Sequence, residues 1–259
     1  MLPPGVVSLR AYDVVGDPGV HTGMPSTSLT LILSVDEPLQ VGWAGRPATR
    51  TSHWGGLAGL HDLPAQIHHG GRQRGVQVSL SVAGARALLG LPASALAGVV
   101  ADAADVDPVL RELPARLAEA APQRWESLVA DALLAALASR AGAGAAVPRA
   151  EVGHAFRCLA AGMAVADVAD EVGYSRRHLT ALVRAEAGVS PKTYARLARF
   201  ERSHALVKRG VRLAEVAARC GYTDQSHLAR DWRDLAGCSP RRWLSREFPF
   251  VLAAGGAGE

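Results

Sequence analysis

Two clusters of polar side chains, 49 residues apart in the second half of the chain, have the spacing of helical stripes. In the first, Arg177, Thr180, Ala181 and Arg184 follow the i, i+3, i+4, i+7 pattern of one helix face. Long donors at the ends and small residues in the middle let a helix approach base edges in a major groove about 12 Å wide. With the second cluster, the candidate DNA contacts are Arg176, Arg177, Thr180, Ala181, Arg184, Gln225, Ser226, His227, Ala229, Arg230 and Arg233.

The two stripes belong to two copies of one longer pattern. The first copy, VADVADEVGYSRRHLTALVRAEAGVSPKTY, begins at Val165, and the second, LAEVAARCGYTDQSHLARDWRDLAGCSPRRW, begins at Leu213. Each copy predicts a helix, a tight turn at glycine, a second helix and a glycine stop, which places helix-turn-helix units at 165–187 and 213–236. A polar stripe on one helix is usually only its solvated face. Two copies in register favour a functional surface.

The rest of each copy predicts how the stripes are held. We expect Leu179 and Val183 to face a core, as do Leu228 and Trp232 in the second copy, and residues 192–209 to form a connecting helix. At about 1.5 Å per residue that helix spans about 27 Å, which suits recognition helices about one DNA turn, roughly 34 Å, apart.

Two acidic residues distinguish the second copy. We expect Asp224 to cap its helix. We expect Asp224 and Asp231 to bring negative charge near the DNA backbone, so that the second unit contributes less affinity than the first.

These motifs resemble the AraC/XylS-type regulators. The resemblance covers about Val152 to Phe248, through GYSRRHL, SPKTYARLARF, LAEVAARCGYTDQSHLARDWRDLAG and SPRRW in the family's order. It implies a seven-helix domain whose two helix-turn-helix units bind adjacent major grooves. The family's base contacts fall here on Arg177, Thr180, Ala181, Gln225, Ser226, Ala229 and Arg230. Ala181 and Ala229 depart from the long polar residues often found there and can offer only a methyl contact to thymine.

The first half of the chain has a different residue pattern, which is typical of β-strands followed by helices. Residues 5–15, 27–35, 38–43, 65–69 and 75–82 are apolar or alternating and predict strands; helices are predicted at 85–90, 108–121 and 122–140. This order resembles the cupin-like sensing domains that often precede such DNA-binding units. The predicted fold is therefore α+β: an N-terminal β-rich, cupin-like barrel domain with helices (1–140), a linker (141–150), and an all-α C-terminal domain with two helix-turn-helix motifs (151–250).

The helix predicted at 122–140 carries a regular apolar stripe from Trp125 to Leu137. Such a stripe usually packs within its own domain, and the alternative is that it forms a dimer interface. Because paired half-sites are common, we expect a homodimer formed through the first 140 residues.

The net charge of each half and the lack of long apolar runs limit the classes of protein that the chain can belong to. Up to position 150 there are eleven Arg or Lys and twelve Asp or Glu, a net charge of −1; the remainder has seventeen and twelve, a net charge of +5. A protein that binds DNA without regard to sequence should be more evenly basic. The start of the chain lacks the blocks of a secretory signal, and no long apolar run predicts a membrane span. We expect a cytoplasmic protein.

The histidines and cysteines bear on metal binding and enzyme activity, the alternatives to a purely DNA-binding function. Five histidines, His21, His53, His61, His68 and His69, lie in the first half, but without the ligand spacing of a cupin metal site, so neither a metal nor another cofactor is expected. The enzyme alternatives are a cupin-type metalloenzyme and a DNA-repair alkyltransferase, each with a DNA-binding appendage. The second needs an activated thiolate, whereas all three cysteines fall inside the predicted DNA-binding unit. The expected partners are double-stranded DNA, a small-molecule effector of unknown identity and RNA polymerase.

Overall fold

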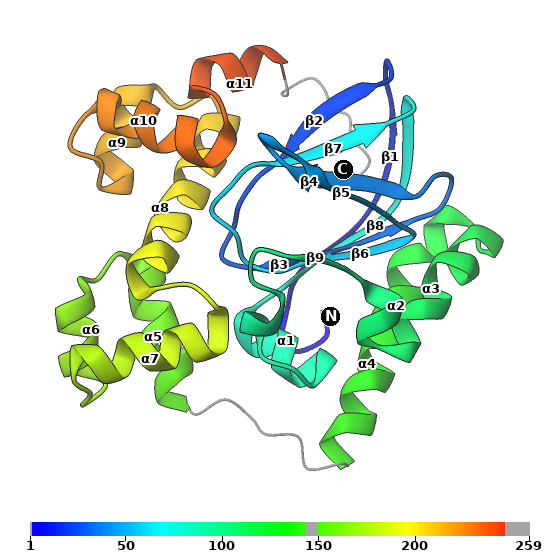
Figure 1. Ribbon diagram of the computed structural model, residues 1–259, viewed down its shortest axis with the longest axis horizontal. Helices are drawn as coiled ribbons and strands as arrows, with labels where there is room; N and C mark the ends of the chain where they lie inside the picture. Colours follow the sequence, from blue (N-terminus) through cyan, green and yellow to red (C-terminus); the bar gives the residue numbers. More distant parts are fainter. Residues whose placement is uncertain (1, 143–149, 247–259) are drawn as a thin grey trace.

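Two antiparallel sheets form the N-terminal half of the chain (Figure 1). The computed structural model describes residues 2–142 and 150–246. One sheet has the order β1-β8-β3-β6-β9, with β1 at Val6–Val15, β8 at Arg72–Leu80, β3 at Leu29–Ser34, β6 at Gly55–Ala58 and β9 at Val100–Asp102. The other has the order β2-β7-β4-β5, with β2 at Gly19–Gly23, β7 at Ala65–His69, β4 at Leu39–Trp43 and β5 at Arg46–His53. The predicted β-rich domain is thus confirmed, as two sheets rather than a closed barrel.

The centre of the first sheet is apolar because its strands alternate in phase. In the β3–β8 register, Leu29 lies opposite Leu80 and Leu31 opposite Val78, and all four are fully buried. Direct cross-strand pairs of this kind are the main stabilising contacts of an antiparallel sheet.

Helices cover the outer face of this sheet. They are α1 at Val82–Leu89, α2 at Ala103–Val106, α3 at Pro108–Glu119 and α4 at Trp125–Gly142, with short 3-10 turns η1 at Ala93–Leu96 and η2 at Pro122–Arg124. On α4, Trp125, Val129 and Leu133 are buried against α1, α3, β1 and β8. The apolar stripe is therefore used inside its own domain, and it no longer supports the predicted dimer interface.

Four strands were not predicted from the sequence. β5 is largely exposed and carries the polar sequence RPATRTSH, β2 and β6 are rich in glycine, and β9 has three residues. Each forms by pairing with a neighbouring strand, so its own residues give little local signal.

Seven helices form the described part of the C-terminal half: α5 at Ala150–Ala161, α6 at Val165–Glu171, α7 at Arg176–Ala187, α8 at Pro191–Lys208, α9 at Leu213–Cys220, α10 at Gln225–Ala236 and α11 at Pro240–Arg246. The all-α fold predicted for this half is confirmed. Most of the predicted linker, residues 143–149, lies outside the described residues. None of the described helices is both long and apolar enough to span a membrane.

Candidate nucleic-acid interface

Helices α6 and α7 form the first helix-turn-helix unit. Val168 of α6 packs in one buried cluster with Leu179 and Val183 of α7, which fixes the angle between the two helices. The Ser175 hydroxyl accepts a backbone N–H of the first turn of α7, and Gly188 ends the helix with a left-handed φ of 74°. The glycine stop and the core residues predicted for the second helix of this unit are confirmed.

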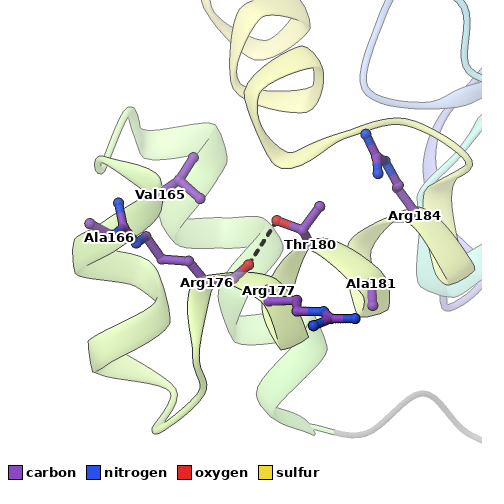
Figure 2. Close-up of a pocket in the computed structure, with 7 residues that line it drawn as sticks. All are labelled: Val165, Ala166, Arg176, Arg177, Thr180, Ala181 and Arg184. Atoms are coloured by element: carbon purple, nitrogen blue, oxygen red, sulfur yellow. Dashed lines mark hydrogen bonds between the residues drawn. The ribbon is translucent and has the colours of Figure 1, made fainter.

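The predicted stripe of α7 lies along a shallow groove of about 640 Å³, shown in Figure 2. The groove is lined by Val165, Ala166, Arg176, Arg177, Thr180, Ala181 and Arg184. All three arginine side chains are exposed, whereas Thr180 is half-buried and its hydroxyl donates to the carbonyl of Arg176 at 2.8 Å. The donor of Thr180 is therefore used within the helix, and its oxygen and methyl group face the groove.

Helices α9 and α10 repeat this arrangement. Val216, Leu228 and Trp232 are buried in the core of the second unit. The Asp224 carboxylate accepts the N–H of His227 at 2.7 Å, as predicted for a helix cap, and these backbone hydrogen bonds lower the pKa of Asp224. A carboxylate in this position is also favoured by the helix dipole.

The stripe of α10 is less uniform than that of α7. Gln225, Ser226, Arg230 and Arg233 are exposed and Ala229 is half-buried. His227 is held in the turn, because its ring packs edge-on against Tyr222 with 5.1 Å between centroids and its Nδ1 lies 3.2 Å from the Thr223 hydroxyl. Its side chain is thus less available to DNA than its neighbours.

Asp231 does not act as predicted. Its side chain is buried, and its carboxylate accepts hydrogen bonds from Arg196 at 2.5 Å and from the Tyr222 hydroxyl at 3.0 Å, with Arg199 at 3.5 Å. The negative charge is neutralised inside the domain and does not face the DNA backbone. The prediction that the second unit contributes less DNA affinity than the first therefore loses the support of Asp231.

Helix α8 connects the two units and lies in both cores. Tyr194 packs into the first cluster, and Leu197, Phe200 and Val207 pack into the second. The units lie at opposite ends of this helix (Figure 1). Shared core residues hold the two stripes in a fixed relation, which is what binding to two grooves of one duplex requires.

A second feature is a pocket of about 410 Å³ lined by residues of both sheets and closed at one side by the last turns of α8. Its lining is mainly apolar, and its charged members are Arg10 of β1 and Lys208 of α8. His204 of α8 also lines it, and burial lowers the pKa of this imidazole to about 4. The lining comes from eight strands, two loops and α8, so only the folded chain brings these residues together.

Of the histidines considered as metal ligands, His21 and His69 pack together with 5.4 Å between their ring centroids. Within residues 2–142 and 150–246, no three His, Cys, Asp or Glu side chains lie close enough to hold a metal ion. Cys158 and Cys220 are buried, Cys238 is half-buried, and none of the three forms a disulfide within the described part of the chain.

Comparison with known proteins identifies the helical half. Residues 149–246 match the family model described as a helix-turn-helix domain. The C-terminal domain is an AraC/XylS-type helix-turn-helix domain. The chain is also 30% identical over 87 residues to the HTH-type transcriptional regulator YkgA of Escherichia coli (strain K12); the match covers 33% of this chain and 36% of that regulator.

Solved structures extend the similarity of fold beyond the AraC/XylS-type domain. ToxT from Vibrio cholerae O395 is 12% identical, with a TM-score of 0.53 over 92% of this chain and 97% of ToxT. A fatty-acid-bound ToxT from V. cholerae strain SCE256 is 10% identical, with a TM-score of 0.54 over 100% of this chain and 99% of that one. The two halves of the chain are thus arranged in a fold that ToxT shares.

Proposed function

We propose that this chain is a sequence-specific transcription regulator that binds two adjacent major grooves with α7 and α10. The observation that carries the proposal is the repetition of one unit, with the stripe solvent-accessible in both copies and both copies fixed to α8. Two stripes on one rigid spacer fit a duplex approached from one side.

The stripe residues differ in the contacts they can make. Arg177 has the reach and the planar donors for a guanine edge, and Arg184, lying nearly two turns further along α7, is placed for a phosphate. Gln225, Ser226 and Arg230 are the corresponding base-contact candidates of α10. Loss of a base contact should relax the preference at one base pair, whereas loss of a phosphate contact should weaken binding to all DNA and flatten its salt dependence.

Genomic footprinting with the purified protein tests this proposal. Wild-type protein should protect discrete sites, and Arg177→Ala should weaken binding and relax the preference at one position. Arg116→Ala is the matched control, because Arg116 is an exposed arginine on α3 in the other half of the chain. Protection spread evenly over the genome would contradict sequence-specific binding.

The pocket between the sheets is the proposed effector site. At about 410 Å³ it lies within the usual range of about 300–1,000 Å³ for small-molecule sites. Its charged side chains, Arg10 and Lys208, are both cations, and no Asp or Glu occurs among the described residues that line it. ToxT structures are described with an unsaturated fatty acid and with a naphthalenyl butenoic acid, both carboxylic acids with large apolar groups. The proposed effector is accordingly an organic acid with an apolar body.

Calorimetry with palmitoleate, a long-chain carboxylate, and with palmitoleyl alcohol tests the pocket. Palmitoleate should bind more tightly, and Lys208→Gln should remove at least about 1.4 kcal/mol, a tenfold loss, for the acid alone. Lys192→Gln is the control, because Lys192 is exposed on the same helix and lies outside the pocket. Equal binding of acid and alcohol would contradict an anionic effector.

A homodimer, contact with RNA polymerase and a cytoplasmic location remain proposals that follow from the role of a transcription regulator. Light scattering of the free and DNA-bound protein tests the first. A monomer at tens of micromolar under both conditions would exclude it.

A further inference from the structure

The loop between β6 and β7, residues 59–64, lines two cavities. Its His61 packs on Trp43 with 4.6 Å between ring centroids, and both rings are among the residues that line the interior pocket. The same two rings also line a second cavity of about 470 Å³ at the boundary between the halves of the chain. Arg184 of the α7 stripe lines this boundary cavity as well as the DNA-facing groove. The Trp43–His61 pair is thus a wall shared by the pocket and the boundary cavity.

One side of the loop leads to the first recognition helix. The carbonyl of Leu60 accepts the N–H of Gly98 at 2.8 Å, which ties the loop to the segment after η1. The neighbouring Ala97 packs directly on Gly188, the cap of α7, since a Cβ placed on Gly188 would lie 2.2 Å from that of Ala97. Next to this contact, the Ser94 hydroxyl donates to the carbonyl of Ala185 at 2.6 Å.

The other side of the loop leads to the second recognition helix. The Nδ1–H of His61 donates to the carbonyl of Leu63 at 2.6 Å. The next residue, Pro64, lies beside Gly237, the cap of α10, because a Cβ placed there would be 3.6 Å from Cγ of Pro64. Gly188 and Gly237 are equivalent positions of the two repeats, and both are the left-handed ends of recognition helices.

We propose that the loop 59–64 transmits occupancy of the interior pocket to both recognition helices, with the Trp43–His61 ring pair as the part that moves. A ligand that displaces the ring pair shifts the loop, and the loop contacts the caps of α7 and α10 through two short chains of contacts. This inference rests on the proposed effector function of the pocket. Coupling of this kind needs one element with two arrangements, each favoured by one of the sites.

Amide hydrogen exchange at the segments around Gly188 and Gly237 tests the proposal in the full chain, with palmitoleate as the probe. Palmitoleate should change the exchange at both caps of wild-type protein at least about fivefold. In His61→Ala the change should disappear, with palmitoleate present at a concentration that saturates this variant. His21→Ala is the matched control, because His21 lines the pocket but not the boundary cavity.

The same variants without probe separate this inference from the effector proposal. His61→Ala should raise the exchange at both caps, and His21→Ala should not. If palmitoleate fails to bind wild-type protein, the acidic-effector proposal fails, and this comparison without probe decides the role of the loop. A cap response that persists in His61→Ala, or equal effects of the two histidine variants, would overturn the inference. His61→Gln, which keeps a polar side chain and loses the ring, replaces His61→Ala if the latter does not fold.

Discussion

Gly188→Ala is the most direct perturbation of the contact between the two halves of the chain. Gly188 ends α7 with φ at 74°, a conformation that L-residues other than glycine adopt at a cost. A methyl group there would lie 2.2 Å from Cβ of Ala97 and 3.0 Å from Cα of Ser94. The substitution therefore imposes backbone strain and a steric clash at the same position.

The two effects can be estimated separately. Left-handed backbone at alanine costs about 1–2 kcal/mol. To restore an ordinary contact of 3.4 Å, the methyl group and Ala97 must separate by about 1.2 Å. Overpacking of this kind typically costs about 1–3 kcal/mol, and it strains the nearby Arg86–Glu186 ion pair, in which two N–H groups donate at 2.9 and 3.0 Å. We therefore expect a total loss of about 2–5 kcal/mol in the free energy of unfolding.

Two other glycines supply the control. Gly173 and Gly221 have φ of 70° and 76° in the turns of the two repeats, and a Cβ at either would meet nothing within 4 Å. Their alanine variants should lose only the backbone term. Urea unfolding of all three variants should rank Gly188→Ala clearly below the other two, and Ala97→Gly added to Gly188→Ala should recover part of the difference.

Equal losses for the three glycine variants would refute the reasoning, because the clash exists only if η1 and α7 are in contact in solution. A failure of Ala97→Gly to recover any stability would do the same. In that case the loop 59–64 would also lose its contact with the cap of α7.

Three further predictions concern other parts of the structure. Asp231→Ala should cost about 3–5 kcal/mol in urea unfolding, because it removes the buried carboxylate that Arg196, Arg199 and Tyr222 share, whereas Asp234→Ala, which removes an exposed partner of Arg196, should cost about 0–1 kcal/mol. The His204 imidazole has its pKa lowered to about 4 in the folded chain. The unfolded chain therefore binds this proton at a higher pH, and the free energy of unfolding should fall as the pH drops from about 6.5 to about 4. His204→Gln should flatten that part of the pH–stability curve by up to about 3 kcal/mol, and an unchanged curve would contradict the burial of this ring. Arg177→Ala should cost about 1–3 kcal/mol on a cognate site and more than Arg230→Ala at every salt concentration, and the reverse order would contradict the assignment of the stronger contacts to the first unit.

The parts of the interface that the sequence predicts are those set by local geometry. Helical spacing places Arg177 on the face opposite Leu179 whatever the rest of the chain does, and Ser175 and Asp224 cap the helices that follow them. The prediction for Asp231 was wrong because its carboxylate is buried against Arg196 of α8 and against Tyr222. Arg196, which neutralises it, lies 35 residues earlier on α8. Helical periodicity alone cannot indicate a long-range ion pair.

In the N-terminal half, too, the sequence predicts the elements that depend on local pattern and not those that depend on neighbouring elements. The strands β3 and β8 have enough alternating apolar residues to be predicted, because one face of each is buried whichever strand lies beside it. Strand β5 is nearly all exposed and forms because β4 offers it a free edge. The interior pocket depends on the distance between two sheets and on the position of α8, and neither has a signature in the linear order of residues.

The repeat also has a consequence for how the two recognition helices respond to the rest of the chain. Gly188 and Gly237 have nearly the same φ and the same place in their units, yet their surroundings differ. At Gly188 the approach of Ala97 leaves no room for a methyl group, whereas a methyl group added at Gly237 would lie 3.6 Å from Cγ of Pro64, an ordinary van der Waals distance. A movement of the loop 59–64 by a few tenths of an ångström therefore acts on α7 through a closer contact than on α10. The first unit, which carries three arginines on its groove, should respond first and should determine how much DNA affinity changes.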